Sequence, residues 1–168
     1  MAGEISHDNG LFDSRDVAAY IAQECIKNGY RYNNTKIQKL LYCAYGVVLA
    51  GRNRRLCDEY PRAWQYGPVF PKVFRAVSKG QDLAQYSYVV RDNCQVDIKR
   101  LIDTSVRIFG KYNATALSKW SHKSGSPWDS VTSKDGFKWN DFIPDDLIAE
   151  YFTTHVMEAE DYARCSEA

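Results

Sequence analysis

His122 has the neighbours that a catalytic histidine needs. Ser121 precedes it, and Ser118 lies four residues earlier on a predicted helix, so the side chains at 118 and 122 share one face. A base beside a hydroxyl or thiol is the arrangement of nucleophilic catalysis, for which Cys43 and Cys57 are further candidates. No nucleophile elbow or cysteine-protease signature surrounds these residues. We therefore expect His122 to end a helix or contact a partner, and we keep a small hydrolase-type enzyme that uses His122 as an alternative.

Other chemical sites find little support in the sequence. The three histidines lie far apart and the five cysteines form no CxxC pair, so we predict no metal site. The ten glycines show neither Walker nor dinucleotide spacing. The adjacent acids at 58–59 and 145–146 are interpreted as loop charge and helix first-turn charge rather than as an acid–base pair. We predict no cofactor and no catalytic residue.

The composition favours a binding protein. Twelve tyrosines and four tryptophans supply the amphipathic rings that anchor protein interfaces. Basic and aromatic residues interleave between Arg52 and Trp64, but the net charge is only +1 and no nucleic-acid-binding motif is visible, so nucleic acid is not an expected partner.

The same composition predicts a cytoplasmic protein without a membrane span. No apolar run reaches the length needed to cross a bilayer, and the polar residues 1–9 are unlike a signal peptide. The odd number of widely spaced cysteines indicates reduced thiols.

The elements that must position these residues are predicted to be mainly α-helical. We expect a compact single-domain helical bundle with at most a small β-hairpin, comprising a flexible lead-in at 1–12, one domain at 13–164 and a tail at 165–168. Helix-type spacing and capping residues predict helices near 14–28, 35–50, 71–78, 96–112, 114–122 and 144–162. The last of these is predicted to bury His155 on its apolar stripe. Residues 86–90 are predicted as a short strand, 124–127 as a loop that delivers Trp128, and 132–138 as a surface loop.

The segment from Thr35 to Val73 is the most informative in the chain. Its helical part places Ile37, Leu40 and Leu41 on an apolar face, with Gly51 as the predicted end. Residues 58–70 then combine aromatics with two prolines and should be irregular. Such a segment is typical either of core anchoring or of partner recognition.

Three motifs in this order resemble the Panacea domain of the SocA-like, phage-associated antitoxin family. The first is Lys36-Ile37-Gln38-Lys39-Leu40-Leu41-Tyr42, and the second is Leu56-Cys57-Asp58-Glu59 followed by Ala63-Trp64-Gln65-Tyr66-Gly67-Pro68-Val69-Phe70-Pro71-Lys72-Val73-Phe74. The third comprises Leu117-Ser118, Ser121-His122 and Pro127-Trp128. The resemblance extends from Asn34 to Trp128.

The resemblance implies a helical, non-enzymatic antitoxin from a bacterial or prophage toxin–antitoxin operon. Its partner would be a cognate toxin encoded beside it. Members of the family neutralise their toxins by direct binding, or act as a proteolytic adaptor that delivers the toxin to an ATP-dependent protease. Both modes are kept as hypotheses, with direct binding first.

The residues expected to meet the toxin come from the same motifs. Lys36 and Lys39 are predicted to lie on the polar, solvated face of the second helix, where they would suit an acidic toxin surface. Trp64, Tyr66, Gly67, Pro68 and Trp128 are interpreted first as fold-defining, with Gly67 permitting an irregular turn. In the alternative, part of this segment forms a shallow groove for a toxin element. The candidate partner-binding residues are therefore Lys36, Lys39, Trp64, Tyr66, Pro68, His122 and Trp128.

Overall fold

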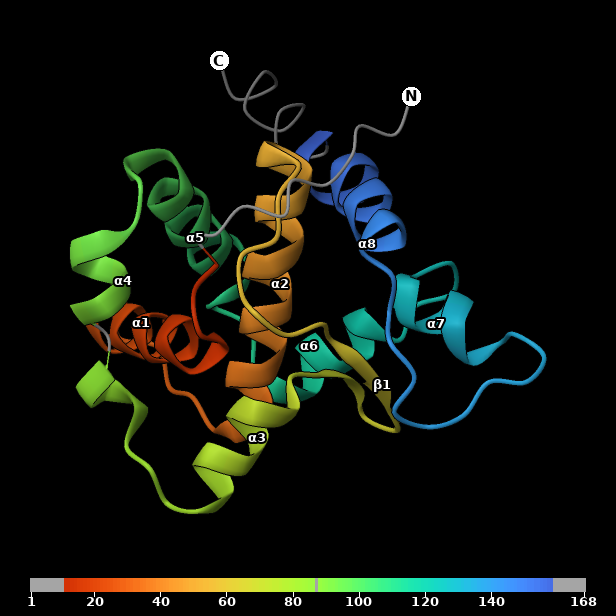
Figure 1. Cartoon of the computed structure of the whole chain (residues 1–168), viewed down its shortest axis with the longest axis horizontal. Coiled ribbons are helices and arrows are strands. Elements are labelled where there is room, and N and C mark those ends of the chain that lie inside the picture. Colours follow the sequence, from red (N-terminus) through yellow and green to blue (C-terminus); the bar gives the residue numbers. More distant parts are fainter. Residues whose placement is uncertain (1–10, 87, 159–168) are drawn as a thin grey trace.

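Helix α2 (Asn34–Arg52) runs through the middle of the molecule, with the other elements arranged around it (Figure 1). In this computed structural model, residues 11–86 and 88–158 are described. The side chain of Asn33 caps the start of α2 by accepting from the backbone N–H of Lys36. The end predicted at Gly51 is wrong, because Asn53 takes the left-handed conformation (φ 51°) that terminates the helix.

Five helices pack directly on α2: α1 (Ser14–Lys27), α3 (Pro71–Ser78), α5 (Val96–Phe109), α6 (Ala114–Ser121) and α8 (Asp145–Phe152). Two shorter helices, α4 (Tyr88–Asn93) and α7 (Pro127–Thr132), lie further out, with a 3₁₀ turn, η1 (Leu83–Tyr86), and a π-helical turn, η2 (Thr153–Met157). The expected mainly α-helical fold is confirmed. None of the described helices is long and apolar enough to cross a membrane.

The core surrounds α2, and its largest aromatic residues lie where α2 meets α8 and the end of the hairpin. Tyr42 and Tyr45 of α2 are almost fully buried, as are Phe70 and Phe152. The Tyr42 and Phe152 rings meet edge to face with their centroids 5.4 Å apart. Gly46 makes this approach possible, because a Cβ at that position would lie 2.5 Å from the Phe152 ring.

The single hairpin in the described residues lies in the aromatic segment. Strands β1 (Arg62–Trp64) and β2 (Gly67–Val69) are antiparallel, with Ala63 opposite Pro68 and Trp64 opposite Gly67. The strand predicted at 86–90 is wrong, because η1 ends at Tyr86 and α4 begins at Tyr88 and buries Val90. A β-branched run without a partner strand has no ladder to join, and burial in a helix satisfies the same side chains.

Two predictions after α6 need revision. The loop predicted at 124–127 is present as far as Ser126, but Pro127 already occupies the first position of α7, the helix that carries Trp128. His155 is exposed and does not lie on the buried stripe. The π-helical turn η2 follows Phe152 and rotates the later side chains relative to the apolar face of α8. Phe12 is anchored, since its backbone pairs with Leu56 and Asp58. Residues 1–10 of the predicted lead-in and the predicted tail at 165–168 lie outside the described residues.

Candidate partner-binding site

The hairpin is held on its outer side by the segment that precedes α8. The backbone N–H of Ala63 donates to the carbonyl of Asp141, and that of Asn140 donates back to Ala63, both at 2.9 Å. The N–H of Ile143 donates to the carbonyl of Pro61 at 3.0 Å. The outer edge of β1 is therefore paired, so the hairpin is a rigid support rather than an open strand edge.

Trp64 is fixed at both its backbone and its side chain. Its indole N–H donates to the side-chain oxygen of Asn140 at 2.9 Å, and its carbonyl accepts from the indole N–H of Trp128 at 2.8 Å. The Trp64 ring packs edge to face against Phe74 of α3, with a centroid distance of 5.1 Å. His122 lies against Trp128 at 4.3 Å between ring centroids. Trp64 of the second motif is thus brought together with His122 and Trp128 of the third.

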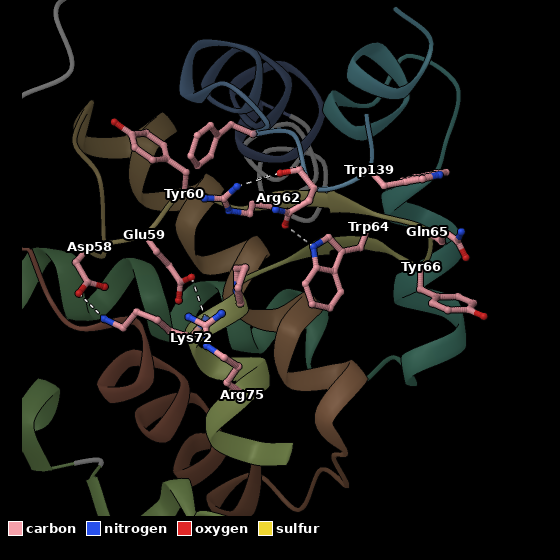
Figure 2. A pocket seen from close by; sticks show the side chains of 13 residues that line it. Asp58, Glu59, Tyr60, Arg62, Trp64, Gln65, Tyr66, Lys72, Arg75 and Trp139 are labelled. Carbon is pink, nitrogen blue, oxygen red and sulfur yellow. Dashed lines mark hydrogen bonds and ion pairs between the residues drawn. The ribbon is translucent and has the colours of Figure 1, made fainter. Parts of the chain in front are cut away.

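A groove of about 940 Å³ opens beside the hairpin (Figure 2). We call it the hairpin groove. Tyr66 at the hairpin tip is 76% exposed, and Trp139 and Phe142 from the facing segment are 52% and 50% exposed. Exposed aromatic rings gathered in one hollow are typical of a binding surface. The groove is lined by Asp58, Glu59, Tyr60, Arg62, Trp64, Gln65, Tyr66, Pro71, Lys72, Arg75, Trp139, Asn140 and Phe142.

Two arginines add charge to these aromatic walls. The guanidinium of Arg62 stacks over the Phe142 ring at 4.1 Å and donates to the backbone carbonyl of Asn140 at 3.1 Å. Arg75 of α3 is exposed and forms no ion pair with any described residue. An exposed arginine beside aromatic rings is a common anchor of protein interfaces.

The acids of the groove are already engaged. Asp58 accepts from the backbone N–H of Ser14 at 3.1 Å and pairs with the ammonium of Lys72 at 2.6 Å. Glu59 accepts from the hydroxyl of Ser14 and from the backbone N–H of Lys72. These carboxylates compensate the start of α1, which refines their interpretation as loop charge. Lys72 is engaged by Asp13 and Asp58, whereas Arg62 and Arg75 form no ion pair with a described residue and are left to face a partner.

The solvated position predicted for Lys36 and Lys39 is wrong, because their side chains are only 5% and 2% exposed. Neighbouring elements enclose α2 on all sides, so positions outside its apolar stripe are also covered. The ammonium of Lys36 donates to the backbone carbonyls of Arg31 and Gly110 at 2.8 and 2.7 Å. The ammonium of Lys39 donates to the carbonyl of Pro68 at 3.1 Å. Both ammonium groups therefore hold backbone carbonyls of neighbouring segments in place, and the aliphatic parts of both side chains are buried.

His122 is not paired with a nucleophile among the described residues. Its backbone ends α6, and its Nε2 is buried without a hydrogen-bond partner in the described chain. The hydroxyl of Ser121 donates to the carbonyl of Ser118 instead. Burial lowers the pKa of His122, with a smaller contribution from Lys39. The helix-end position agrees with the first interpretation of this residue.

Cys43 and Cys57, the two thiols considered as nucleophiles, are not activated by their surroundings. Burial raises the pKa of Cys43 and of Cys57 well above the usual range of a thiol, so both keep their protons at neutral pH. No group of three or more metal-ligating side chains occurs within the described ranges.

The comparison with known proteins adds to this geometry. The family described as antitoxin SocA-like, Panacea domain, matches residues 37–129. The chain belongs to the SocA-like antitoxin family. It is also 29% identical to antitoxin SocA of Caulobacter vibrioides (strain NA1000 / CB15N) in an alignment 144 residues long that covers 79% of this chain and 77% of that protein. No solved structure matches the chain.

The Panacea domain supplies only one wall of the hairpin groove. Trp139, Asn140 and Phe142 lie beyond the residues that match the family, and they were not singled out in the sequence. The signal that was available is a pair of aromatic residues within four positions of each other, just after a segment predicted as a polar surface loop. Sequence reasoning missed them because their role depends on pairing with a hairpin far away in the chain.

Proposed function

We propose that this protein is a cytoplasmic antitoxin that neutralises a cognate toxin by direct, non-catalytic binding, with the hairpin groove as its main contact surface. The observation that carries the proposal is that exposed Tyr66, Trp139 and Phe142 line one groove with Arg75, which forms no ion pair with a described residue. Membership of the SocA-like antitoxin family supports the role, and the groove supplies a surface for it.

The groove fits a protein partner with apolar and acidic character. Its aromatic walls offer contact area at low entropic cost, because each ring has few rotatable bonds. Asp58 is paired with Lys72 and Glu59 accepts hydrogen bonds from Ser14 and Lys72, whereas Arg62 and Arg75 form no ion pair with a described residue, so the groove offers two guanidinium groups to a partner. A toxin segment that carries an apolar side chain beside a carboxylate would complement both features.

Co-expression with the product of the neighbouring gene tests the proposal. The wild-type chain should restore growth and co-purify with that product as a stable complex. Tyr66→Ala and Arg75→Glu should each weaken binding by about 2 kcal/mol or more while leaving the melting temperature unchanged. Tyr112→Ala is the matched control, since Tyr112 is 46% exposed but lies outside the groove.

The outcome also separates direct binding from proteolytic delivery. Rescue that persists in a strain lacking the ATP-dependent protease, with the toxin accumulating in the complex, supports direct binding. Rescue that requires the protease, with loss of the toxin, supports the adaptor hypothesis instead. If the neighbouring product is not toxic, or if no complex forms and growth is not restored, the antitoxin proposal is wrong.

A further inference from the structure

A second hollow of about 320 Å³ shares Trp64 and Tyr66 with the hairpin groove but is closed by other elements. We call it the Lys39 pocket. Residues at the start of α2 line its polar part, and Phe74 of α3 together with Val69 of β2 lines its apolar part. The two hollows therefore adjoin at the exposed tip of the hairpin, so one partner could reach both.

Lys39 lines this pocket, and its ammonium group has fewer hydrogen-bond acceptors than it has donors. Its side chain is 2% exposed, and its ammonium has one hydrogen-bond acceptor in the described chain, the carbonyl of Pro68 at 3.1 Å. An ammonium carries three donors, and a buried charge is normally paired. No carboxylate of the described residues lies within ion-pair distance of it. Lys36, one turn earlier, has two carbonyl acceptors.

A second polar group in the same pocket lacks a partner. The side-chain oxygen of Asn34 is buried and accepts no hydrogen bond from the described chain. A buried acceptor without a donor is costly, and so is a buried cation without an anion. A peptide segment can satisfy both, because it brings backbone N–H donors together with side-chain carboxylates. A free inorganic anion would satisfy only Lys39.

We propose that the Lys39 pocket receives an aspartate or glutamate side chain of the toxin, whose carboxylate pairs with Lys39 while the backbone of the same segment donates to Asn34. This inference rests on the proposed antitoxin function and deepens it. The aromatic rings of Trp64 and Phe74 would shield the ion pair from water, which strengthens the attraction.

Pairing would leave a proton signature. Burial lowers the pKa of free Lys39 to about 8. Among the described residues, the titratable groups near it are Cys43 on the same helix, His122 after α6 and Tyr66 on the hairpin, and none of them is a carboxylate. A carboxylate that enters the pocket would raise the pKa of Lys39, so the complex should take up protons when it forms at pH 8.5.

Titration calorimetry of the purified full chain with the toxin tests the inference. Lys39→Met keeps the length of the side chain and removes its charge. It should weaken toxin binding at pH 7 by at least about 30-fold, because a buried charge pair loses one partner. Proton uptake, measured at pH 8.5 in buffers of different ionisation enthalpy, should occur with the wild type and be absent with Lys39→Met. Lys36→Met is the matched control and should leave affinity and proton uptake unchanged.

The outcomes separate the two proposals. If the wild type binds the toxin and Lys39→Met binds it equally well with the same proton uptake, the pocket inference is wrong and the antitoxin function stands. If the wild type forms no complex, the antitoxin function fails and this inference fails with it. Should Lys39→Met not fold, the wild type alone decides, since a complex that forms at pH 8.5 without proton uptake contradicts the ion pair.

Discussion

The indole N–H of Trp128 donates to the backbone carbonyl of Trp64 at 2.8 Å, across 64 residues of sequence. This bond joins α7 to the hairpin, so the two tryptophans of the family motifs act on one structural unit. The wall of the hairpin groove at Trp64 therefore depends on a helix that does not itself line the groove. The motif residues serve the scaffold and the binding surface together.

Replacing Trp128 with phenylalanine should destabilise the protein by about 1–3 kcal/mol, because the Trp64 carbonyl loses a donor in a half-buried place. The measurement is urea unfolding followed by circular dichroism. Trp139→Phe is the control, since Trp139 is 52% exposed and removal of its indole N–H leaves no buried acceptor without a donor. It should change stability by no more than about 0.5 kcal/mol. Equal effects of both substitutions would contradict a structural role for the bond.

Asn140 should tolerate glycine better than alanine. Its backbone has φ 83°, and its side chain accepts from the indole of Trp64. Both substitutions lose that hydrogen bond, but alanine also adds strain in the left-handed region, so Asn140→Gly should be about 1 kcal/mol more stable than Asn140→Ala. Thermal unfolding of the three proteins gives the order. An alanine variant as stable as the glycine variant would mean that the backbone relaxes at this position.

Gly67→Ala should damage the hairpin by contact as well as by strain. Gly67 has φ 108°, and a Cβ there would lie 2.7 Å from the Ser121 hydroxyl oxygen and 3.0 Å from Cε of Lys39. We expect a loss of stability above the ~1 kcal/mol of backbone strain alone, together with weaker toxin binding. Gly136→Ala isolates the strain, since Gly136 has φ 80° and a Cβ added there would meet nothing within 4 Å. Similar losses for both variants would show that the contact is unimportant.

Lys39 should make the stability of the free protein rise with pH. Its pKa is about 8 in the folded chain and close to 10.5 when unfolded, so between these values the unfolded state binds more protons and folding is favoured as pH rises. Relative to Lys39→Met, the wild type should gain up to about 3 kcal/mol between pH 8 and pH 10.5. Buried tyrosines and thiols oppose this trend in both proteins and cancel in the difference. A difference that stays flat over this range would show that burial does not perturb Lys39.

The helical elements were predictable because their signals are local. The apolar spacing of Ile37, Leu40 and Leu41 predicted α2, and Pro71 marks a helix start that follows from the geometry of proline. The strand predicted at 86–90 failed because β-branched residues report a preference for burial as much as for extended backbone. A strand also needs a partner, which a local pattern does not contain.

The candidate site was predictable only in part. Trp64, Tyr66 and Trp128 were identified from their motifs, whereas Trp139 and Asn140 were missed because Asn140 meets Trp64 across 76 residues. The polar positions Lys36 and Lys39 were expected in solvent because they lie off the apolar stripe of their helix. In the structure the end of α5 covers Lys36 and the hairpin covers Lys39, and backbone carbonyls replace water as their partners.

By itself, the sequence determined that this chain is a helical member of the SocA-like antitoxins, since periodicity and ordered motifs are properties of neighbouring residues. The tertiary structure alone decided that Lys39 is buried beside an apolar pocket and that the groove is closed by Trp139 and Phe142. The physical reason is that burial and hydrogen-bond pairing depend on which distant segments pack together. A buried charge with one weak partner arises only from that packing.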